Sequence, residues 1–478
     1  MSRGLKELRL GRLAALMSLV VLSGCASVDF DQSLATTNQE AADFTQGQLV
    51  LSRTAQQRAS QDATAKQLLM MPISQVNAVQ LALTNSTAMQ ALLAQSWADA
   101  ANAAQVGRIA NPVFSFERIT AGNELEFGRM LSFGLLDLLT LPQRQGVARR
   151  GIERANVQLT ADVVDQVTQV RQAWVKAVAA QQTLGYARQV FEAAQVSAEL
   201  ARRMQFVGNF SRLQRVRQQA FYADAATQLA GAQHQATASR EALVRQLGLT
   251  DAQAAQLKLP ERLPDLPKEP RSPQDAGRLG SVGRLDIRLA QSAYEAAAHA
   301  QGLSTLTSVV DVELGVISQT GFDRAHGDRT TGSGYEISVK LPVFDSGQMR
   351  RDAMNAHTLA ASNRLEATVR SAGSNLRESY SAYRTAFDVA RHYRDEVVPL
   401  RKLMAEENLL RYNGMLIGVF ELLADTRDQV GSVMAAIAAE QQFWLADAAL
   451  QATQMGKPTG SAIGAIASST SGNGDAGH

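Results

Sequence analysis

The chain has 478 residues, a formal net charge of +2, and 45% hydrophobic but only 5% aromatic residues. This nearly balanced charge excludes the strong electrostatic attraction that is typical of nucleic-acid-binding proteins. The six histidines are scattered without the spacing of metal ligands, and no set of residues suited to acid–base or nucleophilic catalysis is recognisable. The sequence therefore predicts no enzyme, no metal site and no cofactor.

The first residues carry the features of a bacterial export signal. Several basic side chains precede an apolar stretch, Leu13–Leu22, that is too short to cross a bilayer. The tetrapeptide that ends at Cys25, the single cysteine, resembles the lipobox at which bacterial lipoproteins are cleaved and acylated. The resemblance implies a signal peptide at 1–24 and covalent lipid, such as palmitate, on Cys25. More than one acyl chain anchors a protein stably, and Ala26 in place of aspartate favours the outer membrane. An ordinary secretory signal with a chance cysteine is the alternative.

A helix and a β-hairpin follow a polar lead. Residues 25–71 form this lead, extended or partly helical, which we expect in the periplasm. Ser74 is placed to cap a helix that continues to about Gln105. Asn111-Pro112 closes this segment. Two stretches of alternating apolar and polar residues then flank a short glycine-containing turn and predict a hairpin. We expect its strands at about 113–120 and 125–136.

A long helical pair comes next. Helical periodicity extends from Gln143 to about Phe206, which at 1.5 Å per residue gives a rod of about 95 Å. Gly208 and Asn209 form a turn, after which Leu213–Leu247 returns as a second helix.

Much of this order recurs later in the chain. The motif Leu93–Ser96 returns as Leu289–Ser292, and an acidic residue and two alanines follow in both places. Such collinear matches predict an internal duplication. The expected divisions are a first repeat at 72–250, a proline-rich linker at 251–275, a second repeat at 276–455 and a disordered tail at 456–478.

The second repeat has its own strands and helical pair. Its strands are expected at about 308–320 and 334–341. The glycine-containing segment Gly321–Ser333 is expected to be the loop between them. Hydrophobic residues that recur every seven positions from Val369 to Val397 predict a long helix with a packing seam. The turn into the last helix then comprises Tyr412, Asn413 and Gly414.

The last expected strand has one apolar and one polar face. We expect Tyr335, Ile337, Val339 and Leu341 to face lipid, and Glu336, Ser338 and Lys340 to line the lumen of a barrel. The strands of one chain cannot close a barrel, and an open sheet edge is not viable in lipid. Three copies would supply about twelve strands, within the range of outer-membrane barrels. A soluble β-layer beneath a coiled coil is the alternative.

The predicted fold class is therefore mainly α with a small membrane β part. Long coiled-coil helical hairpins would form a trimeric α-barrel. The four strands of each chain would contribute to a trimeric outer-membrane β-barrel of about 12 strands.

The order of these elements resembles the outer membrane efflux protein family, the TolC-like channels, and in particular its lipid-anchored branch. The residues that carry the resemblance are Asn111-Pro112, Leu341–Gly347, Pro399 and Arg411–Gly414. The resemblance implies a homotrimeric passive duct through periplasm and outer membrane. It also implies a periplasmic adaptor (membrane fusion protein) and an inner-membrane pump as partners, in an efflux or type I secretion system. The exported compound, a small molecule or a metal ion, stays open, as does the energy source of the pump.

Members of this family have acidic residues around a closable periplasmic aperture. Here Glu421 matches the first acidic position, whereas Ala424 occupies the second and Asp425 lies one residue later. Glu421 and Asp425 are therefore the gate candidates, with solvated helix-surface charges as the alternative. The candidate adaptor-docking turns contain Gly208, Asn209, Tyr412, Asn413 and Gly414. Glycine also serves simply to relieve a tight turn.

A different class of function is the main alternative. A lipid-anchored periplasmic coiled-coil protein, structural or adaptor, would share the helical hairpins. A structural coiled coil would lack the two-faced strands, and an adaptor would carry flanking lipoyl-like half-motifs that are not recognisable here. The channel interpretation is therefore favoured.

Overall fold

The computed structural model describes residues 29–459, apart from 123, 275–276, 278–282, 308–310, 324–325, 341–343 and 345. The expected signal peptide at 1–24, Cys25 and most of the expected tail at 456–478 lie outside the described residues. The chain divides into two compact units. The sheet unit contains residues 29–33, 95–158 and 287–369, and the helical unit contains 34–94, 159–286 and 370–459.

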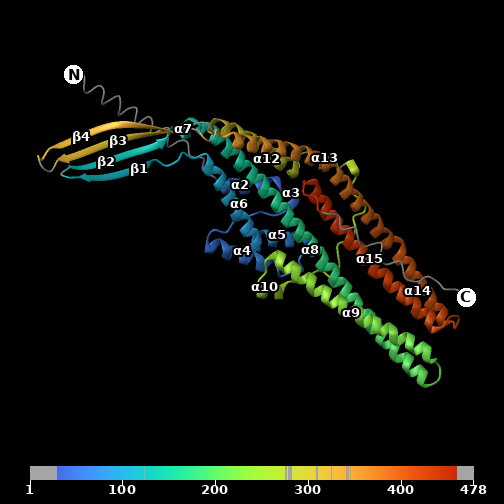
Figure 1. Ribbon diagram of the computed structural model, residues 1–478. Coiled ribbons are helices and arrows are strands. Elements are labelled where there is room, and N and C mark those ends of the chain that lie inside the picture. The colour runs from blue at the N-terminus through green and yellow to red at the C-terminus, as the bar shows by residue number, and fades with distance from the viewer. Residues whose placement is uncertain are drawn as a thin grey trace. The chain divides into compact units, whose positions relative to one another are not determined.

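Helices make up most of both units (Figure 1). The elements up to the first strand are α2 (Phe30–Glu40), α3 (Ala42–Thr45), α4 (Ala55–Leu68), α5 (Gln75–Asn85) and α6 (Thr87–Val106). Next come β1 (Val113–Ala121), β2 (Glu124–Gly134), α7 (Leu135–Leu139), α8 (Leu141–Phe206), α9 (Arg212–Leu247) and α10 (Asp251–Gln256). The second half has α12 (Leu285–Thr307), β3 (Asp311–Asp323), β4 (Arg329–Lys340), α13 (Gln348–His392), the π-helical segment η1 (Tyr393–Val397), α14 (Val398–Asn413) and α15 (Val419–Gln454).

The strands form one antiparallel sheet in the order β1-β2-β3-β4. Since β1 and β3 follow helices and β2 and β4 lead into helices, α6, α7, α12 and α13 connect at one end of the sheet, and the hairpin turns lie at the other end (Figure 1). β1 and β4 each have a neighbour on one side only. The backbone groups along their outer edges are therefore free to pair with another chain.

Three strand ends differ from the sequence expectation. β2 ends at Gly134 rather than 136, because the next residues form α7, which an ion pair of 2.7 Å between Asp137 and Arg144 holds against α8. β3 extends to Asp323 and β4 begins at Arg329, so most of the expected loop 321–333 is paired strand. The start of the expected strand 308–320 and the end of 334–341 lie outside the described residues.

The polar lead is helical rather than extended over much of its described length. α4 begins with a capping box, in which the Thr54 side chain accepts a hydrogen bond from the Gln57 backbone and the Gln57 side chain accepts one from the Thr54 backbone. Ser74 caps α5 as expected, accepting a bond of 3.2 Å from the Asn77 N–H.

The helical unit is built from long antiparallel helices. α8 alone spans 66 residues, far beyond an ordinary globular helix. α8 packs on α9 through small and branched residues, with clusters around Ala180 and Ala236 and around Ala194 and Ala225. A larger aromatic cluster contains Tyr383, Phe387 and Phe443 and joins α13 to α15. The abundant alanines therefore let helix backbones approach closely.

A proline interrupts the long helical stretch that comprises α13 and α14. The five-residue π-helical segment η1 directly precedes α14, whose first turn contains Pro399. Proline has no N–H to continue the α-helical bonding, and a wider π turn accommodates the missing bond. Within the described ranges, no helix combines the length and the hydrophobicity that a membrane crossing requires.

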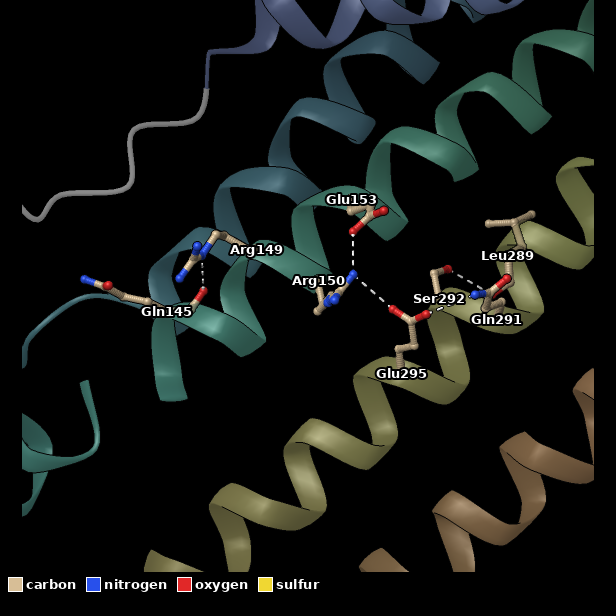
Figure 2. Close-up of polar contacts among 8 residues, drawn as sticks. All are labelled: Gln145, Arg149, Arg150, Glu153, Leu289, Gln291, Ser292 and Glu295. Atoms are coloured by element: carbon tan, nitrogen blue, oxygen red, sulfur yellow. Dashed lines mark hydrogen bonds and ion pairs between the residues drawn. The ribbon is translucent and has the colours of Figure 1, made fainter. Parts of the chain in front are cut away.

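Matching contacts occur in the repeated motif of the sheet unit. The Gln95 side chain donates to Asp99 over 2.9 Å, and the Gln291 side chain donates to Glu295 over 3.1 Å. Figure 2 shows the second contact beside α8, where Arg150 forms an ion pair of 3.0 Å with Glu295. The repeated motif therefore joins α12 to α8 in the second half of the chain.

Candidate membrane and docking surfaces

The sheet has an apolar face made of alternate residues from all four strands. Register places Tyr335 opposite Val316 and Ile337 opposite Leu314. The exposed large apolar residues of this face are Phe114, Phe116, Leu131, Val316, Tyr335, Ile337 and Val339. Tyr335 is 79% exposed, so within the described chain no second layer covers this face. A continuous uncovered apolar surface of this kind is suited to lipid or to another protein.

The opposite face is polar, and it carries Glu336, Ser338 and Lys340 as expected from their alternation. Ser338 Oγ donates to Glu336 Oε1 over 3.2 Å. The other described carboxylates of this face are Glu117, Glu124, Glu126, Glu313 and Asp323. Every glycine of the described strands also lies here, namely Gly128, Gly134, Gly315, Gly321, Gly332 and Gly334. The polar face of the sheet therefore combines carboxylate side chains with glycine positions that carry no side chain.

The turn between α8 and α9 contains two of the expected docking residues. Gly208 adopts φ +80°, and its N–H bonds to the Gln205 carbonyl while the Asn209 N–H bonds to the Met204 carbonyl. This pair of bonds is a Schellman motif, in which glycine favours the left-handed position. Ser211 then caps α9 by accepting a bond from the Gln214 N–H at 3.2 Å. Each helix end at this turn is thereby satisfied.

The turn between α14 and α15 has the same bonding pattern, shifted by one residue from expectation. The Met415 N–H bonds to the Tyr412 carbonyl and the Leu416 N–H to the Arg411 carbonyl. Met415 takes the left-handed conformation at φ +59°, whereas Gly414 has φ −77°. The expectation that Gly414 relieves this turn is therefore wrong, because the helix continues one residue further before the chain reverses.

Both turns expose large apolar side chains. Phe206 is 92% exposed at the first turn and Met415 is 93% exposed at the second. Tyr412 is 40% exposed, and Leu416 also lies open to solvent. These tips are therefore more apolar than ordinary solvated loops.

The gate candidates lie on the first turns of α15. Glu421 is exposed, and Asp425 is half-buried one helical turn later, so the two side chains lie on the same side of the helix. Asp425 Oδ2 is buried without a hydrogen-bond partner among the described residues. A lone buried carboxylate oxygen is costly in an isolated chain.

No pattern in the sequence indicated the role of Arg427, which follows Asp425 by two positions on α15. The Arg427 guanidinium lies 4.0 Å from the centre of the Phe221 ring on α9, in a cation–π contact. Burial lowers the pKa of Arg427, and the nearby Asp224 carboxylate opposes this shift. Arg401 on α14 also pairs with Asp428 at 3.3 Å. α15 is thus held to both α9 and α14 near its start.

A buried charge cluster was also missed, because its members are far apart in sequence. Arg171 on α8 donates to Gln451 over 2.8 Å and to the Phe44 carbonyl. Asp447 pairs with Arg271 at 3.2 Å and accepts a bond of 2.5 Å from Gln451. Burial raises the pKa of Asp447, although Arg271, Gln451 and Arg171 oppose the shift. The cluster joins α8, α15 and the linker.

The described residues include no group of three His, Cys, Asp or Glu side chains that could hold a metal ion. Cys25, the expected lipid attachment site, lies outside the described residues. The surfaces available for function are therefore the two faces of the sheet, the helical turns and the start of α15.

No protein-family model and no curated protein matches the chain. Several solved structures, however, are similar to the chain. The chain is similar to the CmeC outer membrane channel of Campylobacter jejuni, with a TM-score of 0.66, 14% identity and coverage of 86% of this chain and 90% of that one. The open state of the MtrE outer membrane channel of Neisseria gonorrhoeae gives a TM-score of 0.62 at 18% identity, with coverage of 80% and 89%. The outer membrane protein VceC of Vibrio cholerae gives 0.62 at 15% identity, with coverage of 84% and 97%. The chain therefore has the fold of the TolC-like outer membrane channels.

Proposed function

We propose that the protein is the outer-membrane channel of an export system, a passive duct for small molecules or metal ions. The observation that carries this proposal is the sheet, whose exposed apolar face, polar face and two free edges are the features that a membrane pore requires. A soluble protein would cover the apolar face, because burial of such side chains is worth roughly 25 cal/mol per Å².

The free edges support a trimer. A sheet with unpaired outer backbone groups cannot remain open in lipid. Pairing of β1 of one copy with β4 of the next would close a barrel of about twelve strands from three copies. The same symmetry would set the long helical hairpins side by side as an α-helical tube.

The N-terminus supports attachment to the outer membrane. In the proposed protein the signal peptide is removed and Cys25 carries the lipid anchor. The polar face of the sheet, with Glu336, Ser338 and Lys340, lines the lumen, and Tyr335, Ile337 and Val339 face lipid.

The turns and the start of α15 supply the periplasmic functions. The exposed apolar tips around Gly208, Asn209, Tyr412, Asn413 and Gly414 would dock a periplasmic adaptor that links the channel to an inner-membrane pump. Glu421, repeated by three-fold symmetry and followed by Asp425, would concentrate negative potential at the periplasmic aperture and favour cations. The duct itself would perform no chemistry.

The test uses the full-length lipidated protein in planar bilayers, after its oligomeric state in detergent is measured. We expect trimers that insert and conduct ions. Glu421→Gln should reduce the preference for cations. The matched control Glu407→Gln, which removes the same charge from an exposed site on α14, should leave it unchanged.

A protein that stays monomeric, attaches to membranes through Cys25 and never conducts would contradict the proposal. That result would favour a lipid-anchored periplasmic coiled-coil protein. Trimers that conduct, but whose ion selectivity is the same in the Glu421→Gln variant, would refute the gate assignment. The channel proposal would still stand.

A further inference from the structure

The apolar face of the sheet contains three cross-strand pairs of arginine and phenylalanine. Register sets Phe116 opposite Arg129, Phe127 opposite Arg118, and Phe322 opposite Arg329. The rings form a continuous diagonal, with centroids 6.0 Å apart for Phe116 and Phe127 and 6.1 Å apart for Phe127 and Phe322. Arg329 lies 5.5 Å from the centre of the Phe322 ring. We call these six residues the Arg–Phe patch.

The patch occupies one half of the face. Its pairs lie toward the hairpin turns, whereas the rows nearer the helices contain only apolar residues, such as Phe114, Leu131, Val316 and Tyr335. No aspartate or glutamate lies on this face of the described strands, because their carboxylates all lie on the opposite face. The three arginines of the described strands are thus separated from the carboxylates across the thickness of the sheet, and Lys340 lies on the carboxylate face.

The arginines are free to bind a ligand. All three are exposed. Among the described residues, neither Arg118 nor Arg129 has a side-chain hydrogen bond or ion pair, and the contact of Arg329 is with the Phe322 ring. An arginine on a membrane-facing surface is costly at the bilayer midplane and tolerated near the interface. The three guanidinium groups therefore need anions at the level of the headgroups.

We infer that the Arg–Phe patch binds phosphate groups of lipids in the outer leaflet of the membrane. This inference rests on the proposed function, in which the helices lie in the periplasm and the hairpin turns point outward. Arginine presents a planar fork of donors that matches phosphate oxygens bidentately. Aromatic rings are enriched at the same depth, where apolar chains meet polar headgroups. The patch supplies both kinds of contact, and the apolar rows below it meet the acyl chains.

The test compares two lipids with the wild-type trimer. The protein is reconstituted into phosphatidylcholine vesicles that contain either lipid A with its phosphates or chemically dephosphorylated lipid A. Lipid retained on the trimer is counted by native mass spectrometry after gentle extraction. We expect retention of phosphorylated lipid A alone, and excess inorganic phosphate should not displace it. Equal retention of both lipids, or displacement by inorganic phosphate, would overturn the inference.

Variants locate the site. Arg118→Gln/Arg129→Gln/Arg329→Gln should retain phosphorylated lipid A about tenfold less well, since charge-assisted hydrogen bonds are lost. Replacement of the same residues by lysine should give intermediate retention, because charge is kept without the fork. The matched control Arg154→Gln/Arg188→Gln/Arg212→Gln removes the same charge from exposed helix positions and should behave as wild type.

The outcomes separate the two proposals. If the wild type conducts in bilayers but the arginine variants retain lipid A as well as it does, the inference fails and the channel stands. If the wild type inserts into neither kind of vesicle and never conducts, the proposed function fails, and the inference fails with it.

Discussion

The indole N–H of Trp174 donates to the backbone carbonyl of Ile73 over 2.9 Å, and both residues are almost completely buried. Tyr380, which matches Trp174 in the internal duplication expected from the sequence, donates its hydroxyl to the Arg271 carbonyl over 3.1 Å. Both α8 and α13 are thus tied to a segment that precedes them in the chain. The first bond is buried, whereas the second is open to water.

This difference predicts unequal costs for matched substitutions. Trp174→Phe leaves the Ile73 carbonyl buried without its donor, so the free energy of unfolding should fall by about 1–3 kcal/mol, plus a packing loss. Tyr380→Phe should cost about 1 kcal/mol or less, because water replaces the lost hydroxyl. Urea unfolding in detergent, followed by circular dichroism, measures both. A larger loss for Tyr380→Phe would contradict the comparison.

Met415 provides a second prediction. Its left-handed backbone, φ +59°, costs a side chain about 1–2 kcal/mol relative to glycine. Met415→Gly should therefore stabilise the protein by about 1 kcal/mol, and Gly208→Ala at φ +80° should destabilise it by a similar amount. Gly414→Ala, at φ −77°, is the control and should be nearly neutral. Thermal melting distinguishes them, and stabilisation by Gly208→Ala would refute the backbone argument.

Neighbouring residues of β4 give a third prediction. Ile337→Lys places a charge on the apolar face and should reduce membrane insertion, since lysine costs about 2–4 kcal/mol at the middle of a bilayer. Ser338→Lys, one residue along and on the polar face, should insert normally and change ion selectivity instead. Protease protection in vesicles measures insertion. Equal tolerance at both positions would show that this sheet does not face lipid.

The buried carboxyl group of Asp447 gives a fourth prediction. Burial raises its pKa above the ordinary value of 3.8, so between these two pKa values the folded state binds a proton that the unfolded state releases. The free energy of unfolding should therefore decrease as pH rises from 3.8 through the raised pKa. Asp447→Asn should remove this slope.

Urea unfolding at a series of pH values measures the effect. The control Asp62→Asn changes an exposed aspartate and should keep the wild-type slope. If the Asp447→Asn variant also keeps the wild-type slope, a group other than Asp447 causes the pH dependence.

The fold class was predictable because its helices and strands leave periodic patterns of hydrophobic residues in the sequence. Alternation in Tyr335–Lys340 gave the two faces of β4. Pro399, which carries part of the family resemblance, lies in the first turn of α14, directly after η1. The loop expected at 321–333 was wrong because glycine in a sequence looks the same in a turn and in a strand. Only the register, with Gly321 opposite Thr330, shows that these glycines are paired.

Features that depend on distant residues could not be read from the sequence. Asp447 and Arg271 meet through packing of α15 on the linker, and no local pattern indicates it. Likewise, Arg118 and Arg129 look like ordinary strand residues until pairing places each beside a phenylalanine of the next strand. Met415 was missed because methionine has no preference for a left-handed turn.

The glycines of the polar sheet face have a consequence for the size of the cargo. Gly128 lies opposite Glu117, Gly315 opposite Glu336, and Gly321 opposite Glu126. Each glutamate can therefore lie flat over its neighbour instead of projecting inward. In the proposed assembly the charge would stay at the wall and the middle of the bore would hold few side chains. The widest solute that passes the outer membrane would then be fixed by the backbone circumference, and a bulky residue at Gly315 or Gly332 would lower that cutoff.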